Sequence, residues 1–347
     1  MFENKQPLTS LSELGEFGLI NHLNDKITLI NKSTIKGIGD DAAVLEYSAN
    51  RQILVSSDLL VEGIHFDLSY TPLKHLGYKA AIVNFSDIYA MNGKPEHITV
   101  NIAMSNRFSL EAVDELYEGI LLACKNYEVD LVGGDTSSSK SGLFISITVI
   151  GQAGADKITY RNGAKSNDLI CVSGDLGGAY MGLQLLEREK QVFLANPEMQ
   201  PEIDNYDYIL ERQLKPEARE DIIKLLEKEN IKPTSMIDIS DGLASELIHI
   251  CTSSNVGCTI YDDKIPMDHT TIAFANEINM DPVTATLNGG EDYELLFTID
   301  IKDYNKIKEI KEISVIGHIT DKSEGCNIIC GDNKELVLLK AQGWNAF

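Results

Sequence analysis

The segment KHLGYKAAIVNFSDIYAM, residues 74–91, decides how the rest of the chain is interpreted. Apolar or small residues recur in it every three or four positions, which predicts an α-helix with a buried face. Asp87 falls among the apolar positions Ile82, Phe85 and Ile88, where burial is expected. A buried carboxylate without a partner is costly, so we expect a cation or a hydrogen-bond donor beside Asp87.

The sequence on either side of this helix alternates between strand-like and helix-like patterns. In the first block, strands are predicted at 52–57, 97–104, 129–133 and 142–153, and a second helix, capped by Ser109, at 110–126. In the second block, we predict strands at 167–174, 258–262, 293–300 and 313–319, and helices at 179–190, 217–229 and 241–253.

Two blocks of similar size predict an α/β (α+β) protein of two domains, 1–155 and 156–347. Residues 191–216 contain three prolines and are predicted to form an irregular surface insertion.

The composition excludes several classes of function. The 347 residues include 53 acidic and 30 basic side chains, so the formal net charge is −23. Such a charge argues against nonspecific binding to nucleic acid and against docking on an anionic membrane. No apolar run is long enough to span a bilayer, and no signal peptide is visible. We therefore expect a cytoplasmic protein.

The cysteines support the same expectation. The six cysteines form no C-x-x-C pair, and Cys251 and Cys258 have no His or Cys nearby in the sequence to complete a zinc site. Packed, reduced thiols are the simplest interpretation.

Acidic residues gather in short turns rich in Gly and Ser, beside apolar runs. Carboxylates at strand ends are expected to converge on one edge of a sheet, where α/β proteins usually bind ligands. Crowded anions repel one another, and Mg²⁺, which prefers oxygen ligands, relieves that repulsion. The turns are Gly37–Asp41, Ser56–Asp58, Asn84–Asp87, Gly133–Thr136, Asp238–Gly242 and Gly289–Asp292.

Each turn alone has a simpler explanation, but six in one chain favour a site for several metal ions. A lone Gly-Asp pair is usually just a turn, and Ser240 or Asp241 could cap the helix that follows. The chain has no G-x-x-x-x-G-K-[ST] loop and no kinase-type H-R-D or D-F-G. Any nucleotide would therefore be held through metal ions.

In their order along the chain, the motifs resemble those of the thiamine-monophosphate kinase family. The resemblance covers positions 37 to 297, and GIHF and GGEDYELLF point to this family within a superfamily that includes aminoimidazole ribonucleotide synthetase and selenophosphate synthetase. The motifs are GIGDDAAV, SSDLLVEGIHF, VNFSDIYAMNGKP, VGGDTS, TYRNGAK, IDISDGL and NGGEDYELLF.

The resemblance implies a two-domain fold like that of aminoimidazole ribonucleotide synthetase. Its N-terminal domain would pair with a second subunit to form a β-barrel that spans a homodimer. The implied reaction uses ATP and thiamine monophosphate and gives ADP and thiamine diphosphate, with Mg²⁺ required and K⁺ often stimulatory. Because the acceptor phosphate is mostly ionised near neutral pH, we nominate no catalytic general base.

The family's functional positions can be carried over residue by residue. The implied metal ligands are Asp41, Ser56, Ser57, Asp58, Asp87, Asp135, Asp238 and Asp241. The implied ATP contacts are Tyr117, Gly134, Asp135, Arg161 and Ser240. The implied substrate contacts are His65, Glu291 and Trp344, of which the last two suit a flat thiazolium cation.

Some of these residues have structural alternatives, and two other functions stay open. Tyr117 also fits the core stripe of its helix, His65 could cap a turn, and Trp344 could pack on a domain edge. Another ATP-dependent synthetase or ligase of the superfamily is the first alternative function. A non-catalytic metal- or nucleotide-binding regulator is the second.

Overall fold

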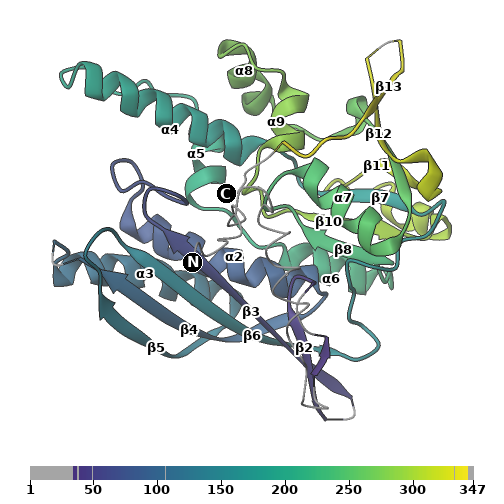
Figure 1. The fold of residues 1–347 in the computed structure, drawn as a ribbon, viewed down its shortest axis with the longest axis horizontal. Helices are drawn as coiled ribbons and strands as arrows, with labels where there is room; N and C mark the ends of the chain where they lie inside the picture. The colour runs from purple at the N-terminus through teal and green to yellow at the C-terminus, as the bar shows by residue number, and fades with distance from the viewer. Residues whose placement is uncertain (1–33, 37–38, 49, 106, 332, 343–347) are drawn as a thin grey trace, which may run out of the picture.

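The computed structural model describes residues 34–36, 39–48, 50–105, 107–331 and 333–342. Its helices and strands form two halves, each built on one mixed sheet, and the first sheet ends before the second begins (Figure 1). The α/β (α+β) class predicted from the sequence is therefore confirmed. None of the helices in the described part of the chain combines the length and the hydropathy of a bilayer-spanning segment.

The first half contains a six-stranded sheet in the order β1-β2-β3-β6-β4-β5. Its longest pairing is antiparallel, between β3 and β6, and β5 is a parallel edge strand beside β4. The elements are β1 (Thr34–Lys36), β2 (Ala43–Ser48), β3 (Arg51–Val61), α2 (Leu73–Ala90), β4 (Lys94–Met104), α3 (Leu110–Tyr127), β5 (Asp130–Ser138) and β6 (Phe144–Gly154).

The second half contains a seven-stranded sheet in the order β13-β12-β9-β11-β7-β10-β8. Its strands are β7 (Leu169–Ser173), β8 (Ser235–Asp238), β9 (Gly257–Tyr261), β10 (Leu295–Ile299), β11 (Ile313–Thr320), β12 (Cys326–Cys330) and β13 (Glu335–Leu338). Its α-helices are α4 (Gly178–Ala195), α5 (Asp207–Leu214), α6 (Glu220–Lys228), α7 (Leu243–Ser254), α8 (His269–Glu277), α9 (Pro282–Asn288) and α10 (Tyr304–Ile307). Short 3₁₀ turns lie at Asp262–Lys264, Ile301–Asp303 and Lys322–Glu324.

Helix α2 is the central element, because it packs on the first sheet and also contacts the second half. It is buried along most of its length, which accounts for the apolar pattern of residues 74–91. Its close crossing with α3 requires glycine, since a Cβ on Gly77 would lie 1.9 Å from the carbonyl oxygen of Leu116. Toward the second half, the Ser86 hydroxyl donates to Asp238 at the end of β8.

Most of the predicted elements are present, and α3 is capped as expected, since the Ser109 side chain accepts from the Ala112 N–H. The prediction of an irregular 191–216 segment was wrong in part. Helix α4 continues to Ala195, and α5 occupies 207–214, where Ile209 packs into a small core with Met181 and Leu185 of α4.

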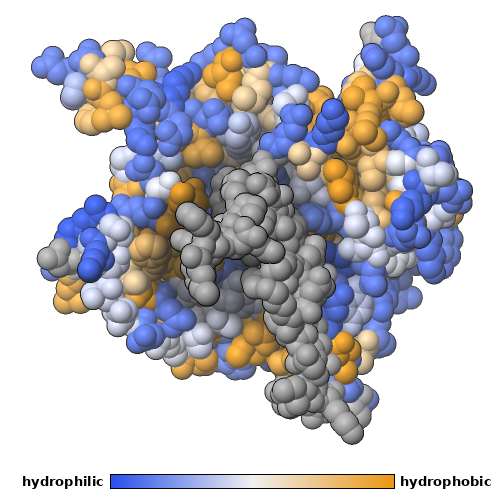
Figure 2. Space-filling model, in the orientation of Figure 1, coloured by the Kyte–Doolittle hydropathy of each residue, from blue (hydrophilic) through white to orange (hydrophobic). Residues whose placement is uncertain are grey.

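The face shown in Figure 2 is mostly hydrophilic, as expected from the net charge. Hydrophobic side chains gather at several places on it, two of them toward its upper corners (Figure 2). One lies at the end of α4, where Phe193 and Leu194 are exposed, and the other lies along β12 and β13, where Leu336 and Leu338 are exposed.

Candidate active site

A cleft of about 1290 Å³ is lined by residues of both halves. Five of the six segments singled out in the sequence meet here, although they are far apart along the chain, and the sixth, Gly133–Thr136, does not line the cleft. The sequence-predicted site residues that line the cleft are Asp41, Ser56, Ser57, Asp58, His65, Asp87, Arg161, Asp238, Ser240, Asp241 and Glu291.

Three carboxylates from three different elements form the centre of the cleft. Asp41 precedes β2, Asp87 projects from α2, and Asp238 ends β8, and one oxygen of each lies within 4.8 Å of the other two. Two serines hold the group in place. The Ser56 hydroxyl lies 2.5 Å from Asp87 Oδ2, and the Ser86 hydroxyl donates to Asp238 Oδ2 at 2.6 Å. The expected convergence of carboxylates is therefore present for these three residues.

The cluster is electrostatically strained without a cation. Burial raises the pKa of Asp87 well above its ordinary value, and the nearby charges of Asp58, Asp238 and Asp41 raise it further. Burial, followed by the charge of Asp41, raises the pKa of Asp238 to about 8. Burial also raises the pKa of Asp58 to about 6. The protein thus holds several carboxylates where their charged forms are unfavourable.

Asp58 provides the most direct sign that the cluster suits a metal ion. Its Oδ2 atom is buried and has no hydrogen-bond partner. A buried carboxylate oxygen without a hydrogen-bond donor costs free energy unless another group, such as a cation, contacts it. A group of carboxylates in which one oxygen has no hydrogen-bond partner is a suitable ligand set for a hard cation such as Mg²⁺.

Arg161 closes one side of the cluster. Its guanidinium makes a bidentate contact to Asp41, with Nε 2.8 Å from Oδ2 and Nη2 2.9 Å from Oδ1. Its backbone N–H donates to Asp40 Oδ1 at 3.2 Å. Both carboxylates are therefore fixed before any ligand binds, and Arg161 faces the cleft beside them.

Glu291 is also paired inside the cleft. Lys79 Nζ of α2 and Gln213 Nε2 of α5 each donate to Glu291 Oε2 at 2.9 Å. Glu291 and Tyr293 adopt positive φ angles of 67° and 51°, so the loop that carries them is locally strained. Such a loop persists only if its surroundings hold it firmly.

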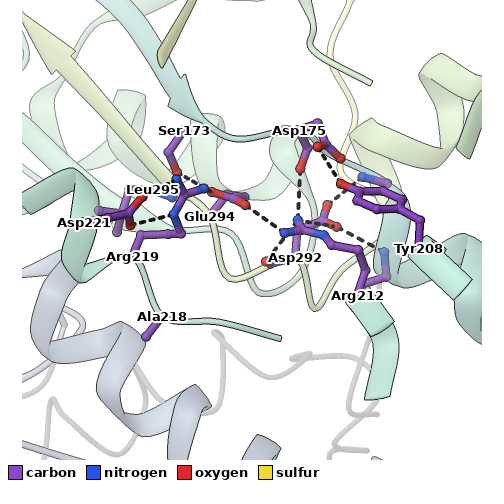
Figure 3. A network of polar contacts seen from close by, with 12 residues as sticks. Ser173, Asp175, Tyr208, Arg212, Ala218, Arg219, Asp221, Asp292, Glu294 and Leu295 are labelled. Carbon is purple, nitrogen blue, oxygen red and sulfur yellow. Dashed lines mark hydrogen bonds and ion pairs between the residues drawn. The ribbon is translucent and has the colours of Figure 1, made fainter. Parts of the chain in front are cut away.

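A buried network of ion pairs holds this loop from behind (Figure 3). Arg212 Nη1 donates to Glu294 at 2.8 Å, and Arg219 and Ser173 contact the other oxygen of Glu294 (Figure 3). Asp292 accepts from the backbone N–H of Gly177, just before α4, at 2.7 Å. These charges are paired and lie away from the cleft, so they position the loop that carries Glu291.

His65 lies in the cleft and also caps a turn. Its Nδ1 accepts from the Val61 N–H at 3.0 Å, as the structural alternative predicts. Burial lowers its pKa, which favours the neutral ring. A neutral ring whose Nδ1 accepts a hydrogen bond carries its proton on Nε2, so that nitrogen is the donor.

Three predicted residues are not brought to this cleft. Gly134 and Asp135 lie on the exposed edge strand β5, where the absence of a Cβ lets Gly134 approach the Val100 carbonyl. Tyr117 packs against the core from α3. Trp344 lies outside the described residues.

Ser57 lines the cleft, but its hydroxyl is engaged elsewhere. It donates to the Ile147 carbonyl at 3.1 Å and lies 3.0 Å from the Thr148 hydroxyl. Because side chains alternate along β3, Ser57 points to the opposite side of the sheet from Ser56 and Asp58.

Sequence reasoning missed several residues of the site. Asp41 was predicted as a metal ligand but Asp40 was not assigned a role, although two adjacent aspartates were a signal for both. Lys79 and Gln213 lay within helical patterns that gave no hint of a role. Glu246 of α7 was also missed: its Oε1 accepts from the Asp241 N–H at 3.1 Å, while its buried Oε2 has no partner.

Comparison with known proteins gives consistent matches. Residues 39–153 match the family model described as AIR synthase related protein, N-terminal domain. Thiamine-monophosphate kinase of Buchnera aphidicola subsp. Schizaphis graminum is 36% identical over 343 residues, which cover 96% of this chain and 99% of the relative. The Bacillus subtilis protein of the same name is 33% identical and covers 96% of this chain and 100% of the relative.

A solved structure supports the same relationship. AaThiL complexed with AMPPCP and TMP superimposes with a TM-score of 0.83 at 30% sequence identity. The match covers 99% of this chain and 100% of that one. The likeness therefore extends over both halves and the cleft between them.

Proposed function

The chain belongs to the thiamine-monophosphate kinase family, and on this premise we propose that it transfers the γ-phosphoryl group of ATP to thiamine monophosphate. The products are ADP and thiamine diphosphate. The support comes from relatives of that name over nearly the whole chain and from the related structure complexed with AMPPCP and TMP.

The charge of the cleft is the observation that carries the mechanism. Among the described residues, nine acidic and three basic side chains line it. Each of the three basic side chains is already paired with an acidic one: Lys79 with Glu291, Arg161 with Asp41, and Lys190 with Asp67. Two phosphate-bearing substrates cannot be held in such a cleft without added positive charge.

We assign the added charge to several Mg²⁺ ions. Asp41, Asp58, Asp87 and Asp238 would hold them, with Ser56, Ser240 and Asp241 beside them. When bound, Mg²⁺ neutralises phosphate charge and orients the reacting oxygens for in-line transfer. K⁺ is a further cation that the family resemblance implies.

The protein's own side chains orient the two substrates. Asp41 and Asp40 hold Arg161 in place, and the guanidinium N–H groups that do not bind Asp41 would donate hydrogen bonds to the triphosphate. The phosphate of the acceptor is its own nucleophile and is mostly ionised near neutral pH, so no side chain needs to remove a proton. His65 and the loop of Glu291 line the cleft where the acceptor would be recognised.

We also propose that the protein acts as a homodimer. Exposed side chains of the first sheet include Leu59 of β3, 55% exposed, and Val132 of β5, 58% exposed. Among the described strands, β5 pairs only with β4 and therefore forms an edge of the sheet. A second copy would cover this surface, as the dimer-spanning β-barrel requires. The substitution Val132→Lys should shift the protein from dimer to monomer in analytical ultracentrifugation, and an unchanged dimer would refute this surface.

The dimer gives Asp135 and Gly134 a possible role, because they lie on that edge strand and outside the chain's own cleft. We propose that Asp135 acts across the interface. Mixed dimers of Asp135→Asn and Asp87→Asn chains should then recover activity that neither variant has alone. If mixed dimers recover no activity, Asp135 acts only within its own subunit or has no role in the reaction.

The direct test compares ADP release with thiamine monophosphate, free thiamine and hydroxymethylpyrimidine phosphate as acceptors. We expect release only with thiamine monophosphate and Mg²⁺, and none in EDTA. ADP released with a different acceptor would favour another synthetase or ligase of the superfamily. No release with any acceptor would favour a regulator. Because the six cysteines are all free thiols, we propose a cytoplasmic location for the reaction.

A further inference from the structure

Three cysteines meet in the second half, away from the carboxylate cluster. Cys251 belongs to α7, Cys258 to β9 and Cys326 to β12, and their Sγ atoms all lie within 4.8 Å of one another. All three are free thiols. No local pattern in the sequence indicates this group, because Cys326 is distant in sequence and is brought beside Cys258 by the parallel pairing of β12 with β9.

The surroundings of this cysteine group are apolar, but one of its members is accessible to solvent. Cys251 and Cys258 are 2% and 0% exposed and lie within a core that includes Ile260 and Ile328. Cys326 is partly exposed, which gives an entry path from solvent.

We propose that the cysteine group binds one Cu(I) ion through three sulfur ligands. Thiolates are soft ligands and select soft cations such as Cu(I) over the hard Mg²⁺ of the cleft. Among the described residues, no His, Asp or Glu joins this group as a fourth donor. Structural Zn²⁺ sites are almost always four-coordinate, so three sulfurs favour Cu(I) over Zn²⁺. The ion enters as Cu(I), and each thiol that ligates it releases its proton to solvent.

The position of the group connects it to the cleft. Cys251 lies on the core-facing side of α7, and other residues of the same helix, Ile248, His249 and Thr252, line the cleft. An ion held by the group would tie α7 to β9 and β12. The ion would therefore stabilise the wall of the cleft and would take no part in phosphoryl transfer.

The test is an anaerobic titration of the reduced, full-length protein with Cu(I), in competition with a chromophoric Cu(I) chelator. We expect one Cu(I) per chain and a rise in the thermal unfolding midpoint. Cys326→Ser and Cys251→Ala should each weaken binding by about tenfold or more, since one of three sulfur ligands is lost. Circular dichroism confirms that each variant is folded.

Cys330→Ser is the matched control, because Cys330 lies on the same strand, is also partly buried and is not part of the group. It should bind Cu(I) as the wild type does. Equal loss in Cys330→Ser, or unchanged affinity in Cys326→Ser and Cys251→Ala, would overturn the proposed site. Tighter binding of Zn²⁺ than of Cu(I), in a parallel titration, would overturn the choice of ion.

Discussion

Asp87→Asn should make the metal-free protein more stable while abolishing its turnover. The carboxylate oxygens of Asp41, Asp87 and Asp238 lie within 4.8 Å of one another. At this separation two ionised groups repel by about 3.5 kcal/mol at an effective dielectric constant of about 20. Partial protonation already relieves some of this repulsion, and Asn weakens the hydrogen bond from Ser56. We therefore expect a net gain of about 2–3 kcal/mol at pH 8.

The sign of the pH dependence follows from the raised pKa values. A carboxyl whose pKa is higher in the folded than in the unfolded state keeps its proton longer when folded. Stability of the metal-free wild type should fall as pH rises from about 4, the ordinary Asp value, through about 6 for Asp58 and about 8 for Asp238. The gain from Asp87→Asn should be smaller at pH 5, where more of the carboxyls are protonated in both proteins.

The assay is urea unfolding of both proteins in EDTA and in Mg²⁺, at pH 5 and pH 8, with ADP release measured on the same samples. Mg²⁺ should stabilise the wild type more at pH 8 than at pH 5. Mg²⁺ should also stabilise the Asp87→Asn variant less than it stabilises the wild type. The matched control is Asp263→Asn, an exposed acid outside the cleft. If Asp87→Asn were no more stable than the wild type in EDTA at pH 8, the repulsion argument would fail. Turnover near the wild-type rate would remove Asp87 from the metal ligands.

Three further substitutions test other parts of the site. Arg161→Lys loses the bidentate contact to Asp41 and should raise the KM for ATP by about tenfold, with a smaller effect on the KM for thiamine monophosphate; equal effects on both would contradict the assignment to ATP. Glu294→Gln removes the buried partner of two arginines and should cost about 3 kcal/mol in urea unfolding. It should also raise the KM for thiamine monophosphate, because the loop of Glu291 loosens, and an unchanged unfolding midpoint would refute the role of the network. Trp344→Ala should raise the KM for thiamine monophosphate more than that for ATP; equal changes would rule out stacking on the substrate.

The sequence predicted that Asp41, Asp87 and Asp238 lie close together because the relevant signals are local. Asp87 stands out against the apolar pattern of its own helix, and Asp41, Asp58 and Asp238 each sit in or beside a turn or strand that the sequence marks. The fold brings these positions to one cleft, but only Asp238 ends a strand. The expectation that they converge as strand ends was wrong for Asp58, which lies within β3, and for Asp87, which lies within α2. Element types over long periodic segments were predictable because their signals are also local.

What the sequence could not predict depends on pairings between distant positions. Helix α5 was hidden by the prolines on either side of it, which end neighbouring segments without preventing a two-turn helix between them. The place of Asp135 on an exposed edge strand depends on the order of strands in the sheet. No local pattern specifies that order. The division into domains 1–155 and 156–347 remains a prediction, although one sheet ends at Gly154 and the next begins at Leu169.

The pairing of Glu291 changes how the acceptor must be recognised. The sequence suggested a carboxylate available to a thiazolium cation, but Lys79 already neutralises Glu291, and its Nζ atom also donates to the Gln213 carbonyl. Glu291 is partly exposed and carries one negative charge, so it cannot fully neutralise two cations at once. If the cationic ring of the substrate contacts Glu291, the ion pair between Lys79 and Glu291 must weaken. The nearest new partner for its charge is an anion, and the substrate supplies one in its phosphate. On that premise, the cationic ring of the acceptor would replace Lys79 at Glu291, and the phosphate of the acceptor would pair with Lys79. A molecule that carries both groups would then bind more favourably than a cation alone or a phosphate alone.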